Sequence, residues 1–253
     1  YLETDNDHPS IDVLFRFISN GRSVVELVIG NLVTLSRRLY ETNIRCKQGH
    51  WDKNNTGRFE VLGKTLGILG LGNIGRSVAR VAQELGMKIL FYDTRQVSVE
   101  LGKELGWKCV DTIEELFRES DCLTIHVSAQ DIKGMTNEGM IDSDLFSKFA
   151  ENRENSPRIF INFSRGFLHR PEDVVKAIEK GHIRYAAVDV YPHEPRKGES
   201  WENPYEGCEN VIAFPHIGAS TQEAQPRIAK RVSETLGAFS NSGTVRDTPF
   251  RPR

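Results

Sequence analysis

The chain contains few of the residues that mark specialised protein classes. Its 253 residues include 4 cysteines, 3 methionines and 3 tryptophans, and no apolar run approaches the length of a membrane span. The N-terminus lacks the basic and apolar regions of a signal peptide. No C-x-x-C pair and no grouping of metal ligands is formed by Cys46, Cys109, Cys122 and Cys208. We therefore expect free thiols in a reducing compartment, no metal, and a cytoplasmic location.

The chain also has no excess of charge of one sign. Lysine and arginine number 33 against 35 aspartate and glutamate, which gives a net charge of −2 and a pI near 6.4. This balance offers no electrostatic attraction to nucleic acid or to an anionic membrane, so we expect neither as a partner. The length suffices for one large or two modest domains with a buried core.

The stretch Thr65–Ser77 is where the sequence becomes informative, because an apolar strand, a glycine turn and a helix start follow one another directly. Gly70, Gly72 and Gly75 have the G-x-G-x-x-G spacing of a dinucleotide-binding turn. In such a turn the first glycine makes the bend, the second lets a pyrophosphate approach the backbone, and the third lets helix and strand pack closely. The helix is predicted by apolar residues at three- and four-residue steps, namely Ile74, Val78, Val81, Ala82 and Leu85.

A second apolar run, residues 88–92, ends at Asp93, at the distance where an acid binds the ribose 2′-hydroxyl of a dinucleotide. A carboxylate there favours NAD, because it would repel the 2′-phosphate of NADP. Arg95 follows two residues later and could favour that phosphate instead. The alternative for Asp93 is an ordinary turn residue at a strand end.

Strand-like runs alternate with helical segments along the rest of the chain, which predicts an α/β fold with a doubly wound parallel sheet. Besides the two runs above, the predicted strands are 122–127, 158–162, 185–190 and 211–214. One strongly apolar helix is expected from Ser23 to Leu39, and it could be a core helix or a subunit interface. Trp51, in the polar segment that follows, could be interfacial or could cover the core.

Ligands of such sheets bind beyond the carboxyl ends of the strands, and three polar side chains there form a coherent chemical set. The guanidinium of Arg165 can grip a carboxylate through two hydrogen bonds. The imidazole of His216 can exchange a proton near neutral pH, and Glu194 can hold the tautomer of that imidazole. Together they suit the dehydrogenation of a 2-hydroxy acid. Singly, each could be an ordinary strand-end or surface residue.

Five motifs, in order along the chain, resemble the D-2-hydroxyacid dehydrogenases: residues 20–30, the GLGNIG turn, and residues 162–166, 187–195 and 215–224. The resemblance implies that Arg165 binds the substrate carboxylate, that His216 is the general base and that Glu194 is its acid partner. Asp189 matches the acid that holds the nicotinamide carboxamide. The NAD contacts it implies are Gly70, Gly72, Asn73, Ile74, Gly75, Asp93, His126, Val127, Ser164, Asp189, His216 and Gly218.

Within this family the similarity is greatest to the phosphoglycerate branch, which implies 3-phosphoglycerate as substrate and serine biosynthesis as the setting. A glyoxylate or hydroxypyruvate reductase and a non-catalytic NAD-sensing scaffold or corepressor are the alternatives. The resemblance also implies a homodimer or higher homo-oligomer built on the helix after residue 20. We expect residues 1–20 to be a remnant of a substrate-binding lobe, 21–220 the NAD-binding domain, and 221–253 a C-terminal helix and tail. The connection from Phe146 to Arg158 is longer and more charged than the family's usual one, and we expect residues 151–155 within it to form an exposed loop.

Overall fold

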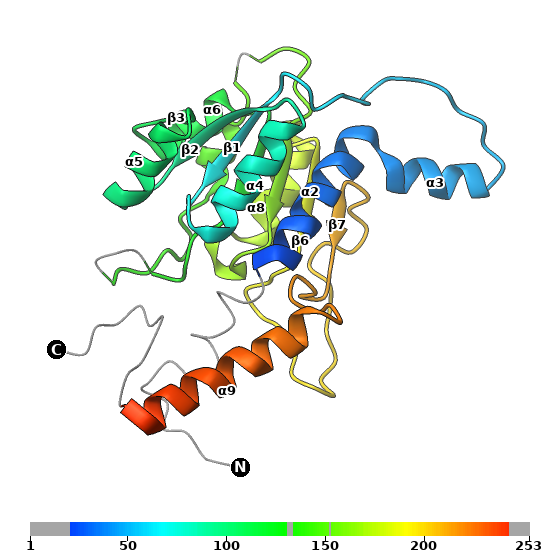
Figure 1. Cartoon of the computed structure of the whole chain (residues 1–253). Helices are drawn as coiled ribbons and strands as arrows, with labels where there is room; N and C mark the ends of the chain where they lie inside the picture. Colours follow the sequence, from blue (N-terminus) through cyan, green and yellow to red (C-terminus); the bar gives the residue numbers. More distant parts are fainter. Residues whose placement is uncertain (1–20, 131–133, 152, 243–253) are drawn as a thin grey trace.

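The structure is a computed structural model that describes residues 21–130, 134–151 and 153–242 (Figure 1). The expected lobe remnant at residues 1–20 and the tail after residue 242 lie outside this range. No helix in these described ranges is both long enough and apolar enough to cross a bilayer.

Seven parallel strands form a single sheet in the order β3-β2-β1-β4-β5-β6-β7 (Figure 1). The order reverses between β1 and β4, which is the topological switch point where ligands of such sheets bind. The predicted doubly wound parallel sheet is confirmed. Its strands are β1 Thr65–Leu69, β2 Lys88–Tyr92, β3 Lys108–Cys109, β4 Cys122–Ile125, β5 Ile159–Asn162, β6 Tyr185–Val188 and β7 Val211–Ala213.

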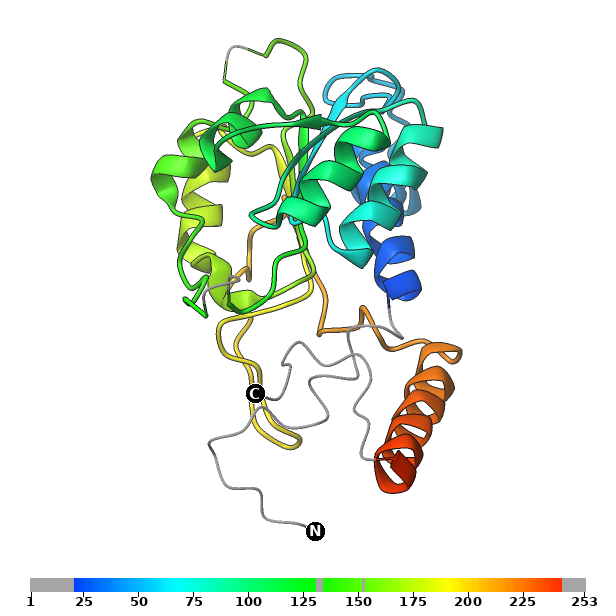
Figure 2. The ribbon, with the colours of Figure 1, turned by 60° about the vertical axis from the view of Figure 1, so that its left-hand side comes forward.

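Helices cover both faces of the sheet (Figure 2). One face carries α2 Gly21–Arg37, α4 Asn73–Glu84 and α5 Gln96–Glu104, and the other carries α6 Ile113–Glu119, α7 Ser143–Ser147 and α8 Pro171–Glu179. The remaining elements are α3 Leu39–Lys47, the short 3-10 helix η1 Gly166–Leu168 and α9 Ala224–Ser242. Figure 1 shows α9 apart from the helices that cover the sheet.

Each central strand contributes side chains to two hydrophobic cores, one on each face of the sheet, because successive side chains point to opposite faces. In β5, Ile159 and Ile161 pack with α2 and α4, whereas Phe160 packs with the helices of the other face. All three side chains are fully buried, and burying each of them stabilises the fold by about 1.5–3 kcal/mol. Burial on both faces explains why the strands are continuous apolar runs without alternation.

The apolar face of α2 is a core surface within one chain, since Val28 and Leu32 are fully buried against the sheet and α4. The single helix predicted from Ser23 to Leu39 is wrong at its end. Arg38 adopts a left-handed conformation, with φ of 54°, so the helix stops and α3 sets off in a new direction. Leu39, expected on the buried stripe, is consequently 47% exposed.

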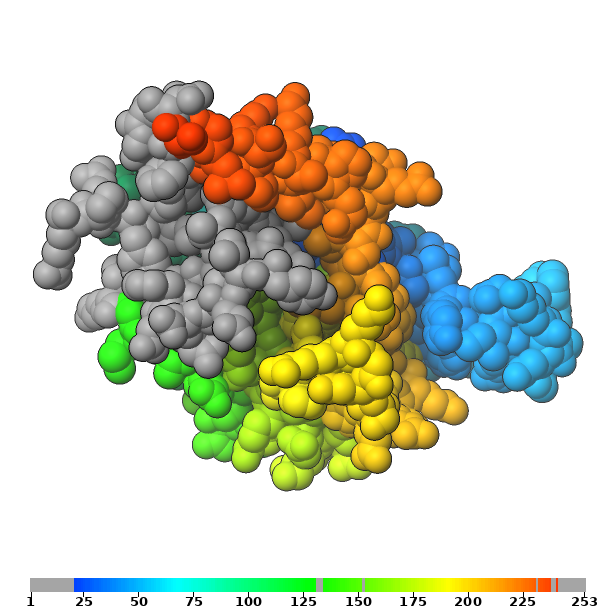
Figure 3. All heavy atoms as spheres, turned by 90° about the horizontal axis from the view of Figure 1, so that it is seen from below, coloured from blue at the N-terminus to red at the C-terminus, as the bar shows by residue number. Residues whose placement is uncertain are grey.

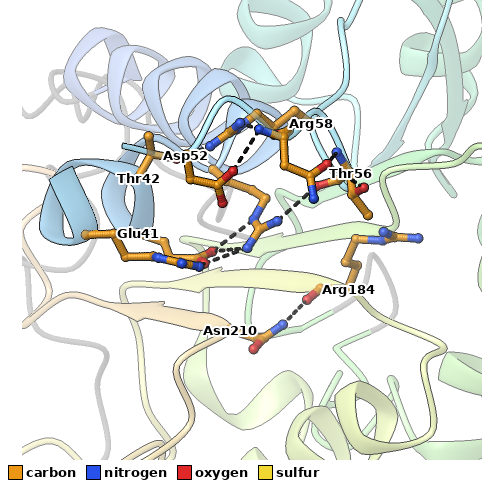
Figure 4. Close-up of polar contacts among 10 residues, drawn as sticks. Glu41, Thr42, Asp52, Thr56, Arg58, Arg184 and Asn210 are labelled. Carbon is orange, nitrogen blue, oxygen red and sulfur yellow. Dashed lines mark hydrogen bonds and ion pairs between the residues drawn. The ribbon is translucent and has the colours of Figure 1, made fainter. Parts of the chain in front are cut away.

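We call α3 and the following loop, residues 39–58, the arm. It projects away from the sheet (Figures 1 and 3) and is held by its own polar contacts (Figure 4). The guanidinium of Arg38 donates to both carboxylate oxygens of Glu41 and, at 2.9 Å, to the carbonyl oxygen of Thr56. Arg58 donates to the hydroxyl of Thr42 at 3.1 Å. These bonds tie the loop to α3, so the arm is an ordered projection.

Of the described residues in the charged segment 151–155, three are exposed, as expected, and the fourth, Arg153, is hydrogen-bonded to the body of the protein. Arg153 donates to both oxygens of Asp121, at 3.0 and 2.6 Å, and to the hydroxyl of Thr65 at 3.1 Å. Thr65 starts β1 and Asp121 directly precedes β4, so the segment is fixed to the amino-terminal edge of the sheet. That edge is opposite the one where ligands bind, and the segment is therefore remote from the candidate site.

Candidate active site

The glycine turn joins β1 to α4 at the switch point of the sheet. Gly70 has φ of +95°, and a β-carbon there would lie 2.7 Å from the carbonyl oxygen of His126. A β-carbon on Gly75 would lie 2.2 Å from the carbonyl oxygen of Gly70, which is the predicted close packing of helix and strand. Both positions therefore require glycine, one for its backbone conformation and both for lack of space.

Gly72 is glycine for a different reason, because the space around its missing side chain is open. A β-carbon there would meet nothing nearer than the Arg95 guanidinium, at 3.6 Å. Gly72 is the N-cap of α4, no side chain caps that helix, and its first turn holds no acidic residue. The first backbone N–H groups of α4 and its positive dipole end thus face an open surface, which is the environment that a pyrophosphate requires. Asn73 and Ile74 start this helix.

Asp93 follows β2, beside the glycine turn. Its side chain is only 5% exposed, and one oxygen accepts the N–H of Leu71 at 2.8 Å. Arg95 donates to the same carboxylate through its backbone N–H and its guanidinium. Burial works to raise the pKa of Asp93, but the hydrogen bonds from Arg95 and Leu71 outweigh it and lower the pKa below its usual value, so the group is anionic.

The loops after β4 and β5 meet beside the turn. Val127 lies against Gly70, and its carbonyl oxygen accepts the hydroxyl of Ser164 at 3.1 Å. His126 is bonded to the hydroxyl of Thr124, and burial lowers its pKa to about 3. The imidazole of His126 is therefore neutral at physiological pH and is a weak base. The three predicted contacts His126, Val127 and Ser164 lie together at the carboxyl ends of adjacent strands.

The carboxylate and imidazole predicted as partners are paired. Nδ1 of His216 lies 2.7 Å from Oε2 of Glu194, and both side chains are partly open to solvent, 50% and 37% exposed. Oε1 of Glu194 accepts the N–H of Tyr191 at 3.3 Å. An ionised carboxylate can accept hydrogen bonds but cannot donate them. The contact with Glu194 therefore places the proton on Nδ1 of His216 and leaves the lone pair on Nε2.

Asp189 holds the backbone on which His216 sits. Its two carboxylate oxygens accept the N–H groups of Ile217 and Gly218, each at 2.7 Å, and the residue is 1% exposed. His216 itself has φ of 54°, a left-handed conformation that costs a histidine about 1–2 kcal/mol. Burial raises the pKa of Asp189 despite the two backbone donors. The carboxylate thus acts as a clamp that keeps His216 in this conformation.

Arg165 lies between β5 and η1 and is half-buried. Its guanidinium donates to the carbonyl oxygen of Ser164 at 2.6 Å, and burial lowers its pKa while the charge of Glu194 opposes that effect. The side chain of Asn162 accepts the N–H of Ser164 and donates to the carbonyl oxygen of Arg165, which fixes the turn that carries both residues. The structure therefore brings Arg165 into the electrostatic range of the Glu194–His216 pair.

Residues 29–218 match the family model described as "D-isomer specific 2-hydroxyacid dehydrogenase, NAD binding domain". That is three quarters of the chain. The chain belongs to this family. In the family's terms, the sheet, the glycine turn and the loops described above form the NAD-binding domain, and NAD is the cofactor of that domain.

Curated relatives of this chain include D-3-phosphoglycerate dehydrogenase 2 of Saccharomyces cerevisiae, 37% identical over 234 residues, and D-3-phosphoglycerate dehydrogenase of Haemophilus influenzae, 35% identical over 229. The matches cover 89% and 90% of this chain but 47% and 52% of those proteins. The chain thus spans about half the length of the curated relatives it matches. A solved structure of a glyoxylate reductase from Paecilomyes thermophila has a TM-score of 0.77 and 27% identity, covering 92% of this chain and 66% of that one.

Two residues that support this candidate site, Gly166 and Tyr191, were not predicted as site residues. A β-carbon on Gly166 would lie 2.0 Å from the carbonyl carbon and oxygen of Tyr191, so the Arg165 turn and the loop that carries Glu194 are in direct backbone contact. The hydroxyl of Tyr191 donates to the carbonyl oxygen of Phe214 at 2.8 Å, which links that loop to the one carrying His216. Both residues lie within the motifs 162–166 and 187–195, and that membership was their signal in the sequence.

Replacing Gly166 with alanine should therefore push the turn that carries Arg165 away from the loop that carries Glu194. The methyl group overlaps backbone atoms, which cannot rotate away as a side chain end can, and the loops must shift. We expect Gly166→Ala to lower the free energy of unfolding by about 2–4 kcal/mol, in the range of severe overpacking. Urea denaturation measures this. Gly237→Ala, in α9 where a β-carbon meets nothing within 4 Å, is the control that should not lower the unfolding midpoint, since alanine favours a helix more than glycine does.

Proposed function

We propose that the protein containing this chain oxidises a D-2-hydroxy acid with NAD, and that D-3-phosphoglycerate is its substrate, as a step of serine biosynthesis in the cytosol. The observation that carries the proposal is the 2.7 Å contact between His216 and Glu194, with the guanidinium of Arg165 in electrostatic range. The choice of substrate is supported by the names of curated relatives at 35–37% identity.

In the proposed reaction, His216 removes the proton of the substrate hydroxyl through Nε2. Glu194 accepts the N–H of Nδ1 and stabilises the imidazolium that forms. Asp189 keeps the loop of His216 in place during this transfer. NAD, when bound, supplies the acceptor for the hydride that leaves C2, and this leaves a carbonyl group at that carbon.

Arg165 has the proposed task of binding and orienting the substrate. Its guanidinium can donate two parallel hydrogen bonds to the substrate carboxylate, which fixes the adjacent C2 relative to His216. The side chain already donates to the carbonyl oxygen of Ser164, and its partial burial strengthens its attraction to an anion. The same interaction would favour any 2-hydroxy acid, so Arg165 does not select among them.

The domain division is also part of the proposal. Residues 21–220 would form the NAD-binding domain, and residues 1–20 and 221–253 would connect to a substrate lobe. The position of α9, apart from the helices that cover the sheet, supports a helix that packs on another part of the full protein (Figure 1).

The test is the formation of NADH by the full-length protein from D-3-phosphoglycerate, D-glycerate and D-lactate, with glyoxylate and hydroxypyruvate assayed in the reverse direction. We expect kcat/KM to be highest for D-3-phosphoglycerate. A preference for glyoxylate would favour the second candidate, a reductase, which the structural likeness to a glyoxylate reductase supports. NAD binding without turnover of any of these acids would favour the scaffold.

We also propose that the arm mediates a homodimer. Trp51 is 81% exposed, so it does not cover the core of its own chain, and Tyr40 on the same arm is 61% exposed. Large apolar side chains gathered on an ordered projection mark an interaction surface. Figure 3 shows the arm standing clear of the rest of the molecule, where a second copy can reach it.

Trp51→Ser should therefore weaken self-association. Removing a central aromatic residue from an interface typically costs about 2–4 kcal/mol, which corresponds to a dimer dissociation constant at least about thirtyfold larger. Sedimentation velocity over a concentration series measures it. Val97→Ser, which removes another exposed apolar side chain (76%) far from the arm, is the matched control. A dimer unaffected by Trp51→Ser would contradict the proposal.

A further inference from the structure

The carboxylate expected to bind the cofactor ribose already has its hydrogen-bond positions filled. Oδ1 of Asp93 accepts the backbone N–H of Arg95 at 2.8 Å and its Nε at 3.1 Å. Oδ2 accepts the N–H of Leu71 at 2.8 Å and a terminal nitrogen of Arg95 at 2.9 Å. A carboxylate has about four acceptor positions, and all four are occupied here. A ribose hydroxyl must therefore displace the Arg95 side chain or share the carboxylate with it.

The Arg95 side chain stands at the entrance of the phosphate turn. It is half exposed, and its guanidinium is the nearest group to the open side of Gly72. Arg95 is also the N-cap of α5, whose first turn holds no acidic residue. The guanidinium largely cancels the charge of Asp93, so the carboxylate loses most of its power to repel an anion.

Two more arginines lie on the same side of the turn. A surface hollow between α4 and α5 is lined by Asn73, Arg76, Ser77, Arg80 and Leu101. The side chain of Arg76 is directed by Asn73, whose oxygen it bonds at 2.5 Å, and Arg80 is exposed one turn further along α4. The region next to the Asp93–Arg95 pair thus has an excess of positive charge.

We propose that this chain accepts a 2′-phosphorylated dinucleotide, NADP, in addition to NAD, and that Arg95 is the residue that determines this. With NAD, the ribose hydroxyls share Asp93. With NADP, Arg95 turns from Asp93 to the 2′-phosphate and binds it through two hydrogen bonds, with Arg76 adding charge from α4. The inference rests on the proposed function only in requiring that the ligand be an adenine dinucleotide.

The experiment compares adenosine 2′,5′-bisphosphate with 5′-AMP, two probes that differ only in the 2′-phosphate. Isothermal titration calorimetry gives the dissociation constant of each for the full-length protein. For the unaltered protein we expect the two constants to lie within about tenfold of each other. Arg95→Ala should shift their ratio at least about fivefold against the bisphosphate, since a charge-assisted bidentate contact is lost. Arg95→Lys should recover part of the shift.

Arg118→Ala is the matched control. It removes an equally exposed arginine that pairs with Glu151, and it should leave the ratio unchanged. A change of less than about fivefold in Arg95→Ala, or equal weakening of both probes, overturns the proposal. Because no turnover is measured, the result is independent of the substrate: the protein could fail as a phosphoglycerate dehydrogenase and still pass this test, or the reverse.

Discussion

Replacing His216 with asparagine is expected to lower kcat for D-3-phosphoglycerate by about a thousandfold, since general base catalysis contributes about a hundred- to ten-thousandfold. The dissociation constant of NAD should stay within about twofold. Asparagine keeps a polar side chain of similar reach and tolerates the left-handed backbone at this position, so the loop held by Asp189 is preserved. What is lost is the Nε2 lone pair that takes the hydroxyl proton.

Two other histidines make this experiment decisive. His193 is exposed and next to Glu194 in the chain, so His193→Asn is the matched control and should keep near-full activity. Burial lowers the pKa of His126 to about 3, so its imidazole is a weak base and a poor substitute for His216. Full activity of His216→Asn with normal NAD binding would show that the base lies elsewhere.

Replacing Arg165 with glutamine is expected to lower kcat/KM on the order of a hundredfold. Removing one partner of a buried charge pair costs about 2–5 kcal/mol, and here the pair would be the guanidinium and the substrate carboxylate. Arg165→Lys should recover little of this loss, because an ammonium group cannot make the parallel bidentate contact. NAD binding, measured separately, should be unchanged in both variants.

Arg170→Gln is a suitable control for Arg165→Gln. Arg170 lies five positions later and its bond partner is Asp173, at 2.8 Å, on the face covered by α8. Its loss should leave kcat/KM unchanged. A fall in kcat/KM of less than about threefold in Arg165→Gln would contradict the assigned role, as would a weakening of NAD binding equal to the loss of activity.

The parts of this fold that depend on local pattern could be predicted from the sequence. The spacing of Gly70, Gly72 and Gly75 is a local pattern, and the apolar runs of β1 and β4 are typical of strands buried on both faces. The end of α2 could not be predicted, because the periodicity of apolar residues continues through Leu39. The helix ends because the backbone of Arg38 is left-handed. The side chain of Arg38 is bonded to the carbonyl oxygen of Thr56, which lies 18 residues later in the arm.

The sequence suggests which residues form the candidate site, but it does not show the hydrogen bonds and packing that hold them in place. The carboxylate of Asp189 is bonded to backbone groups 28 and 29 residues away, and no local pattern predicts such a pairing. Gly166 packs on Tyr191 from another loop in the same way. The bond between Asp93 and Arg95 is local, yet a sequence shows only that both are present. Whether they oppose each other as determinants of cofactor choice or form a pair depends on side-chain geometry.

The most direct test of hydride transfer at this site uses D-3-phosphoglycerate carrying deuterium at C2, incubated with NAD and the full-length protein. The account predicts that deuterium appears in the reduced nicotinamide and that His216→Asn abolishes this transfer while NAD still binds. NAD bound without deuterium transfer from this or any other D-2-hydroxy acid would contradict it.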